Sequence, residues 1–147
     1  MENRIVNGSQ KGGSILRSPN GNIRVPIAIS FGAVPGALSR YFLSAIVNHW
    51  LGTAFPFATF FINLSGALIM GFFTSLAVDR RITSPEVRLI VAVGFLGSYT
   101  TFSTYTLDLG RLLETGNWQL IALYWTGSTV LGLLCLELGS YVAQRLP

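Results

Sequence analysis

Four long apolar runs dominate the sequence. They extend from Val25 to about Trp50, from Phe55 to Val78, from Leu89 to Leu107 and from Trp118 to Leu136, where Glu137 and a further apolar turn follow. A helix needs about 20 residues to cross the hydrocarbon core of a bilayer, whereas a tilted strand needs only about 10. The runs therefore predict an all-α membrane protein with four transmembrane helices.

The composition supports a place in the membrane. Only 11% of the residues are charged and 50% are hydrophobic, whereas typical soluble domains carry about 25% charged residues. The net charge is +4, but the basic residues flank the apolar runs and form no stripe with interleaved aromatics, so no nucleic-acid partner is expected. With one histidine, one cysteine and no catalytic motif, the sequence does not predict an enzyme.

The ends of the runs predict domains and orientation. Residues 1–22 are polar and are expected to form a disordered tail, and residues 23–147 a single membrane domain. The side that holds both termini and the connection at residues 79–86 has eight basic residues, namely Arg4, Lys11, Arg17, Arg24, Arg80, Arg81, Arg88 and Arg145. The other side has only Arg111. This bias predicts a multi-pass protein of the cell inner membrane with both termini in the cytoplasm.

The densest polar signal lies in the third run, where residues 98–106 include six serines or threonines and three aromatics. The β-branched threonines, together with Gly94 and Gly97, make a weak continuous helix, so a break is expected here. A break at membrane depth is tolerated where it is buried or lines a polar cavity. Its carbonyls could hold a cation and its N–H groups an anion. The alternative is that the hydroxyls bond back to their own helix and the aromatics only pack.

Polar residues also lie in or near the other runs. Asn63, in the middle of the second run, is either a hydrogen-bonding link between helices or a pore-lining group. Arg40 is the only charge deep within a span and is a functional candidate. The alternative is that its long side chain places the guanidinium at the membrane surface. Asp108 and Glu137, near span ends, are expected to meet headgroups or a basic partner.

Local motifs predict how the helices start and pack. Gly32-x-x-x-Gly36 and Ser128-x-x-x-Gly132 are small-x-x-x-small patterns that favour close approach of helices. Ser84-Pro85 is typical of a helix cap followed by proline at the first helical position.

Four segments together resemble the CrcB/Fluc family of fluoride channels. They are GALSRY at 36–41, TFFINLSG at 59–66, GFLGSYTTFSTY at 94–105, and Tyr124 with Ser128 in the fourth run. They are similar to the family's G-A-x-x-R-[YW], T-x-x-V-N-x-x-G and G-F-x-G-x-x-T-T-F-S-T-F motifs and to its tyrosine and serine. The match spans the chain after about Phe31, and Tyr105 stands where the family has phenylalanine.

The resemblance implies a fluoride-specific channel that exports fluoride passively and so reduces its toxicity. It implies an antiparallel, dual-topology dimer with two pores along the subunit interface, and a structural sodium ion held by main-chain oxygens, here those of Gly97 and Thr100. The pore lining would include Asn63, Phe102, Ser103 or Thr104, Tyr105, Tyr124 and Ser128, with Arg40 raising the local potential for anions. Because of the strong charge bias, the partner is either a second copy or a homologue of opposite orientation.

Two other readings stay open. A coupled transporter, such as a four-helix small multidrug-resistance exporter, is of similar length, but that family relies on a glutamate in helix one, where this chain has Arg40. The third reading is a non-conducting assembly subunit whose partner supplies the working pore.

Overall fold

The computed structural model describes residues 23–79 and 83–146 of the chain. Within these ranges it is built from helices and connections without strands, as predicted. The elements, with η marking π-helices, are α1 (Arg24–Leu51), α2 (Phe57–Thr74), η1 (Ser75–Asp79), α3 (Pro85–Arg88), η2 (Leu89–Leu96), α4 (Gly97–Tyr99), α5 (Phe102–Glu114) and α6 (Trp118–Arg145). The predicted tail at residues 1–22 lies outside the described residues.

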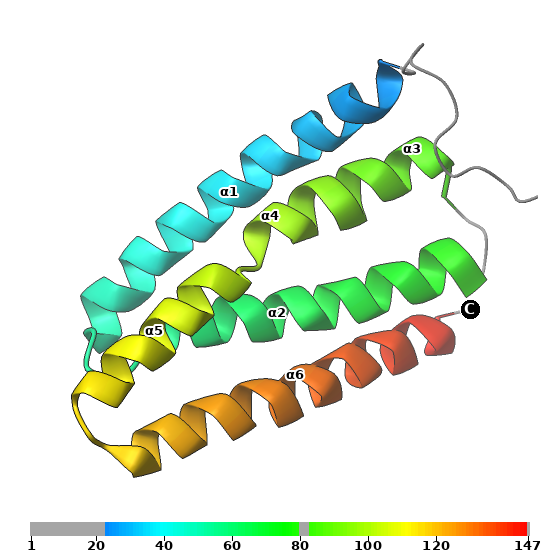
Figure 1. Ribbon diagram of the computed structural model, residues 1–147. Coiled ribbons are helices and arrows are strands. Elements are labelled where there is room, and N and C mark those ends of the chain that lie inside the picture. The colour runs from blue at the N-terminus through cyan, green and yellow to red at the C-terminus, as the bar shows by residue number, and fades with distance from the viewer. Residues whose placement is uncertain (1–22, 80–82, 147) are drawn as a thin grey trace, which may run out of the picture.

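Long rods of alternating direction make up the molecule (Figure 1). α3, η2, α4 and α5 follow one another as a single broken rod. The part up to α4 packs mainly against α1, α5 contacts α6 and α2, and α2 packs mainly against α6. The start of α1, the start of α3 and the C-terminus lie at one end, and the connection from α5 to α6 lies at the other. In the described part of the chain, the beginning of the first run, the end of α6 and the start of the third helix therefore lie at the same end of the molecule, as predicted.

Three helical segments are long and apolar enough to cross a membrane, namely Phe57–Ala77, Pro85–Glu114 and Trp118–Arg145. The chain is thus a multi-pass membrane protein. α1 has sufficient length, with 28 residues, but polar residues interrupt its apolar character and it is not among these segments. A fourth span remains a prediction.

Glycines bring α1 and η2 into backbone contact. A Cβ atom on Gly32 would collide with the carbonyl oxygen of Ile90, and one on Gly94 would collide with that of Ile29. Gly36 also approaches the backbone of this rod. Because only glycine lacks a Cβ, these positions permit the close approach, and the predicted packing face at Gly32-x-x-x-Gly36 is confirmed.

α2 and α6 use other glycines than the predicted ones. Gly71 of α2 lies against the carbonyl of Leu136, and Gly139 of α6 lies against the α2 backbone. Nothing lies within 4 Å of a Cβ built on Gly132, so Ser128-x-x-x-Gly132 makes no close helix contact within the described chain, and its role in packing stays a prediction. Nearer the start of α6, the ring of Phe60 fills the space between the two helices.

The third helix is longer than its apolar run. The run ends at Leu107, but the residues beyond it form an amphipathic helical segment with Asp108 buried, so α5 continues to Glu114. The chain then turns through Gly116, whose φ of 67° suits glycine. The connection to α6 therefore spans only residues 115–117.

The start of the third helix is as predicted. Ser84 accepts a hydrogen bond from the Val87 N–H over 3.3 Å, and Pro85 occupies the first helical turn. The Arg88 guanidinium donates to the carbonyl oxygen of Ala77 in η1. This bond ties the start of the third helix to the end of the second.

Candidate functional site

The third helix breaks at two threonines. Thr100 and Thr101 have extended backbones, with φ/ψ of −77°/158° and −149°/121°. α4 therefore ends at Tyr99 and α5 begins at Phe102. β-branched residues favour extended backbone, and the predicted break in helix three is confirmed.

The carbonyl oxygens of Gly97 and Thr100 are among those that lose their helical donors at the break. In a continuous helix the Thr101 N–H would bond to the Gly97 carbonyl, but it donates to Asn63 Oδ1 over 2.9 Å. Likewise the Thr104 N–H, the helical partner of the Thr100 carbonyl, donates to Thr101 Oγ1 over 3.2 Å. The carbonyls of Gly97 and Thr100 are thus in the position of the last carbonyls of a helix, which need partners from elsewhere.

Asn63 holds the break from α2. Its Oδ1 accepts the Thr101 N–H over 2.9 Å, and its Nδ2 donates to the Thr101 carbonyl over 3.1 Å. One side chain thus satisfies both backbone groups of a residue in the break, and an unpaired backbone group is costly at membrane depth. Of the two roles left open by the sequence, linking helices is observed. The second N–H of Nδ2 takes no part in these two bonds.

A cavity of about 330 Å³, here named the break cavity, lies beside the break. It is lined by Asn63, Thr100, Thr101, Phe102, Tyr105, Ser128 and Thr129. These residues carry no formal charge and offer amide, hydroxyl and aromatic groups. The Ser128 hydroxyl is buried and has no hydrogen-bond partner within the described chain, so it is available to an ion or a water molecule.

Aromatic rings form a row along the break cavity. Phe102 is 80% exposed, and its ring centroid lies 5.9 Å from that of Tyr105. The Tyr105 ring lies 5.1 Å from that of Tyr124. The break separates these rings from Tyr99, which is buried and stacks on Phe95. Because aromatic rings have positive edges, such a row can make favourable edge contacts with an anion that passes along it.

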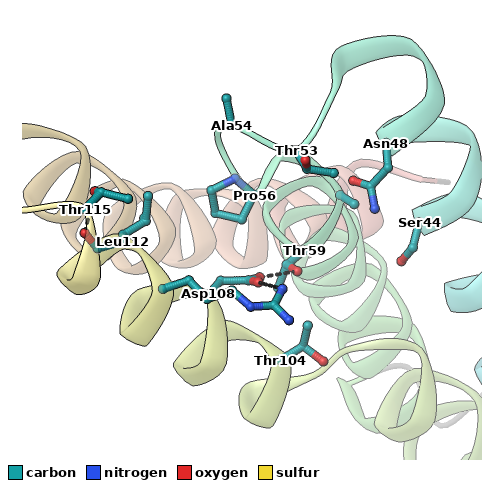
Figure 2. A pocket seen from close by; sticks show the side chains of 12 residues that line it. Ser44, Asn48, Thr53, Ala54, Pro56, Thr59, Thr104, Asp108, Leu112 and Thr115 are labelled. Carbon is teal, nitrogen blue, oxygen red and sulfur yellow. Dashed lines mark hydrogen bonds and ion pairs between the residues drawn. The ribbon is translucent and has the colours of Figure 1, made fainter. Parts of the chain in front are cut away.

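A second cavity, of about 390 Å³ and here named the Asp108 cavity, lies further along α5 (Figure 2). It is lined by Ser44, Asn48, Thr53, Ala54, Pro56, Ala58, Thr59, Thr104, Asp108, Arg111, Leu112 and Thr115. Hydroxyl and amide groups from α1, α2 and α5 therefore surround a single carboxylate. The guanidinium of Arg111 is the positive charge in this lining.

Asp108 is 9% exposed. Its Oδ2 accepts hydrogen bonds from Thr59 Oγ1 over 2.6 Å and from the Tyr124 hydroxyl over 3.4 Å. Its Oδ1 lies 4.0 Å from Arg111 Nη1. Of the two partners expected for Asp108, headgroups or a basic residue, the structure provides the basic one, because α5 continues beyond Asp108 to Arg111 and the carboxylate is turned toward α2. Arg111 is the basic partner within reach.

Tyr124 lies between the two cavities. It is fully buried, its ring packs against Tyr105 of the break cavity, and its hydroxyl donates to Asp108. Thr104 of the Asp108 cavity accepts a hydrogen bond from the Thr101 hydroxyl over 3.0 Å. Polar groups therefore continue along α5 from the break into the Asp108 cavity.

The structure brings four predicted pore residues together in the break cavity, namely Asn63, Phe102, Tyr105 and Ser128. Thr104 lines the Asp108 cavity and Tyr124 lies between the two. Ser103 and Arg40 line neither cavity. Ser103 is exposed, with its hydroxyl 3.2 Å from Thr101 Oγ1, and Arg40 is half-buried on α1.

Three residues of the site were not predicted from the sequence to line it, namely Thr59, Thr101 and Asp108. Their partners are distant in the chain, since 49 positions separate Thr59 from Asp108 and 38 separate Asn63 from Thr101. One signal was present for Thr59. It precedes Asn63 by four positions, so both lie on one face of α2.

Residues 27–140 match the family described as CrcB-like protein, Camphor Resistance (CrcB). A protein of Trichormus variabilis described as "Fluoride-specific ion channel FluC" is 53% identical over 126 residues, which cover 85% of this chain and 90% of that protein. Proteins of the same description from Synechococcus sp. and Synechocystis sp. are 47% and 46% identical, over 84% and 85% of this chain and 95% and 96% of their own lengths. All residues that line the two cavities fall within the matched range.

Proposed function

The chain belongs to the CrcB family, and we propose on that premise that it is a fluoride-specific ion channel through which fluoride leaves the cytoplasm passively. Fluoride enters cells from an acidic medium as neutral HF, which dissociates in the cytoplasm and traps the anion. A passive path outward lowers its concentration and its toxicity. The protein is thus a channel and not an enzyme.

The observation that carries the proposal is the uncharged, donor-rich break cavity. Fluoride is small and strongly hydrated, so a pore must replace its water with other donors. The Ser128 hydroxyl is unpartnered in the described chain, and Asn63 keeps one N–H beyond its bond to Thr101. The ring edge of Phe102 adds positive potential. The proposed fluoride path is lined by these groups and by Tyr105, Tyr124 and Ser103 or Thr104.

A second copy in antiparallel orientation is proposed to complete the pore. In one chain Phe102 is 80% exposed and Leu107 is 54% exposed, and α5 has little packing against the other helices. A two-fold axis through this face would cover Phe102 and place the same groups opposite each other. It would also generate two equivalent pores along the interface.

A structural sodium ion on the two-fold axis belongs to the same proposal. Hard cations take oxygen ligands, as main-chain carbonyls provide in ion channels. The carbonyls of Gly97 and Thr100 have lost their helical donors, and Gly97 is exposed in a single chain. Two copies would supply four such oxygens. The bound ion would add positive potential beside an anion path.

α1 is proposed as the fourth span, in the cell inner membrane. Its 28 residues exceed the about 20 that a span requires. Two of its polar residues, Ser44 and Asn48, line the Asp108 cavity. Arg40 precedes Ser44 by four positions and so lies on the same face of α1. There it would raise the potential for anions approaching this cavity.

Fluoride efflux from liposomes that contain only this chain tests the proposal. A fluoride electrode would follow efflux with and without a proton gradient, with chloride efflux measured in parallel. We expect fluoride to leave down its own gradient without a proton gradient, and chloride to be retained. A strict requirement for a proton gradient would indicate a coupled transporter. Absence of efflux from folded, dimeric protein would contradict a homomeric channel.

Orientation decides whether the partner is identical. The 79–86 connection and Arg88 provide three arginines, whereas the opposite side has Arg111 alone. At about 1 kcal/mol for each basic residue near anionic lipid, a surplus of two skews the orientation about thirtyfold. Few inverted copies would then form, so we propose that this chain pairs at least partly with a homologue of opposite bias.

Labelling of single cysteines in intact cells tests this pairing. One cysteine would be placed at the C-terminus and another at Thr115, in both cases with Cys135 replaced. Labelling of Thr115→Cys alone from outside would support the paired arrangement. Equal labelling of both positions would demonstrate dual topology and contradict it.

A further inference from the structure

α2 supports every residue of the break, and the support starts with Asn63. Both backbone groups of Thr101 are bonded to the Asn63 amide, over 2.9 and 3.1 Å. The Thr101 N–H has lost its helical acceptor at the break, so the Asn63 amide restrains this residue from outside its own helix. The Thr100 hydroxyl adds a bond to the Leu96 carbonyl over 2.9 Å, which secures the end of α4.

Two further residues of α2 meet the break on the α4 side. Ser65 Oγ lies 2.8 Å from the Tyr99 hydroxyl, within hydrogen-bond distance. Gly66 is buried, and a Cβ at this position would overlap Cγ2 of Thr100. Asn63, Ser65 and Gly66, here named the α2 cradle, thus contact three consecutive residues around the break.

We infer that the α2 cradle sets the backbone geometry of the break and thereby controls conduction, with Asn63 acting as a positioning residue for Thr101. The inference rests on the proposed channel function. Thr101 precedes Phe102 directly, and its side chain caps α5. A displaced Thr101 would therefore move the Phe102 ring and the start of α5 together.

A substitution at Gly66 tests the positioning of the break separately from any direct contact with an ion. Gly66 lines neither cavity and has no polar side chain, so a substitution there reaches the ion only through the break. The atom that a new Cβ would strike is the Thr100 methyl group, whereas the Tyr99 ring atoms stand at 3.4 Å or more, which is ordinary contact. Thr100→Ser removes that methyl group and keeps the hydroxyl that bonds to Leu96.

Size compensation provides the first test. Fluoride flux would be compared for Gly66→Ala, Thr100→Ser and the double variant, with Gly132→Ala as control because nothing lies within 4 Å of a Cβ there. We expect Gly66→Ala to lose flux by about tenfold or more, and the double variant to recover to within about threefold of wild type. The Gly132→Ala control should conduct nearly as wild type, and Thr100→Ser alone provides the reference for the flux of the double variant. Wild-type flux in Gly66→Ala, or a double variant as slow as Gly66→Ala, would overturn the inference.

Amide exchange provides a test that does not depend on conduction. In Asn63→Ala, hydrogen–deuterium exchange at the Thr101 amide should be about tenfold faster than in wild type, because that N–H loses its acceptor. If exchange is faster in Asn63→Ala but the wild-type chain conducts no fluoride, Asn63 still supports the break and the proposed channel function is refuted. Lost flux with unchanged exchange would refute the cradle and leave Asn63 as an ion contact only. If Asn63→Ala does not fold, exchange in Gly66→Ala decides, since the same amide should be displaced.

Discussion

The two segments of the broken third helix have opposite surroundings. Before the break, η2 and α4 pack so closely against α1 that Gly32, Gly36 and Gly94 leave no room for a Cβ. After the break, α5 packs little against its own chain and exposes Phe102 by 80%. The contrast indicates that the first segment anchors the fold, whereas the second presents chemical groups to a cavity and to a partner.

The membrane explains why such a division is tolerated. Lipid tails are as apolar as leucine, so the exposure of leucines on α5 to lipid costs little free energy in a chain without a partner. Hydroxyl and amide groups do need partners there. In this molecule they obtain them through Asn63 at the break and through Asp108 in its cavity.

The largest effect is expected from crowding the segment before the break. Gly94→Leu would force its side chain into the α1 backbone, at a cost above the about 1–3 kcal/mol of ordinary overpacking. We expect little or no folded protein by size-exclusion chromatography. The matched change on α5, Gly110→Leu, should fold, because nothing lies within 4 Å of a Cβ there. Equal yields of the two variants would abolish the distinction between the segments.

Phe102→Ile should act on flux and not on folding. The ring is exposed in a single chain, so its removal creates no internal hole, but the positive ring edge is lost. We expect fluoride flux to fall by at least about tenfold, or about 1.4 kcal/mol, with the dimer intact. Phe31→Ile on α1, which replaces a ring that is 72% exposed, is the control and should conduct normally. Wild-type flux in Phe102→Ile would remove this ring from the proposed path.

Ser128→Ala and Ser140→Ala should have opposite effects on thermal stability and on fluoride flux. Ser128 has a buried hydroxyl without a partner in the described chain, so its loss should leave thermal stability unchanged and reduce flux by about fivefold. Ser140 donates to the Gly71 carbonyl over 3.2 Å, so its loss should lower the melting temperature and leave flux unchanged. Thermal scans and efflux on the same preparations give both values. If Ser128→Ala lowered the melting temperature and Ser140→Ala did not, the Ser128 hydroxyl would have a structural role.

The smallest effect is expected from Tyr105→Phe. The change removes one hydroxyl and keeps the ring that packs between Phe102 and Tyr124. Flux should stay within about twofold of wild type, a difference below 0.5 kcal/mol. Loss of flux would instead make the Tyr105 hydroxyl an essential fluoride ligand.

Features that depend on local sequence were predictable. Apolar run lengths predicted the helices, and the threonine-rich segment after Gly97 predicted the break, because both depend on neighbouring residues. The end of α5 was missed because the segment beyond Leu107 is amphipathic and not apolar. Contacts across the chain were also missed. The sequence shows that Asn63 needs hydrogen-bond partners. Only the fold places the Thr101 N–H against its Oδ1 and the Thr101 carbonyl against its Nδ2.

Blocking the break cavity tests most directly whether fluoride passes through it. Thr129 lines this cavity and is exposed, so Thr129→Cys in a Cys135→Ser background provides a single target for the membrane-permeant reagent N-ethylmaleimide. We expect normal fluoride efflux before modification and none after complete modification, confirmed by mass, while the Cys135→Ser parent is unaffected. Undiminished efflux from fully modified protein would contradict a path through the break cavity.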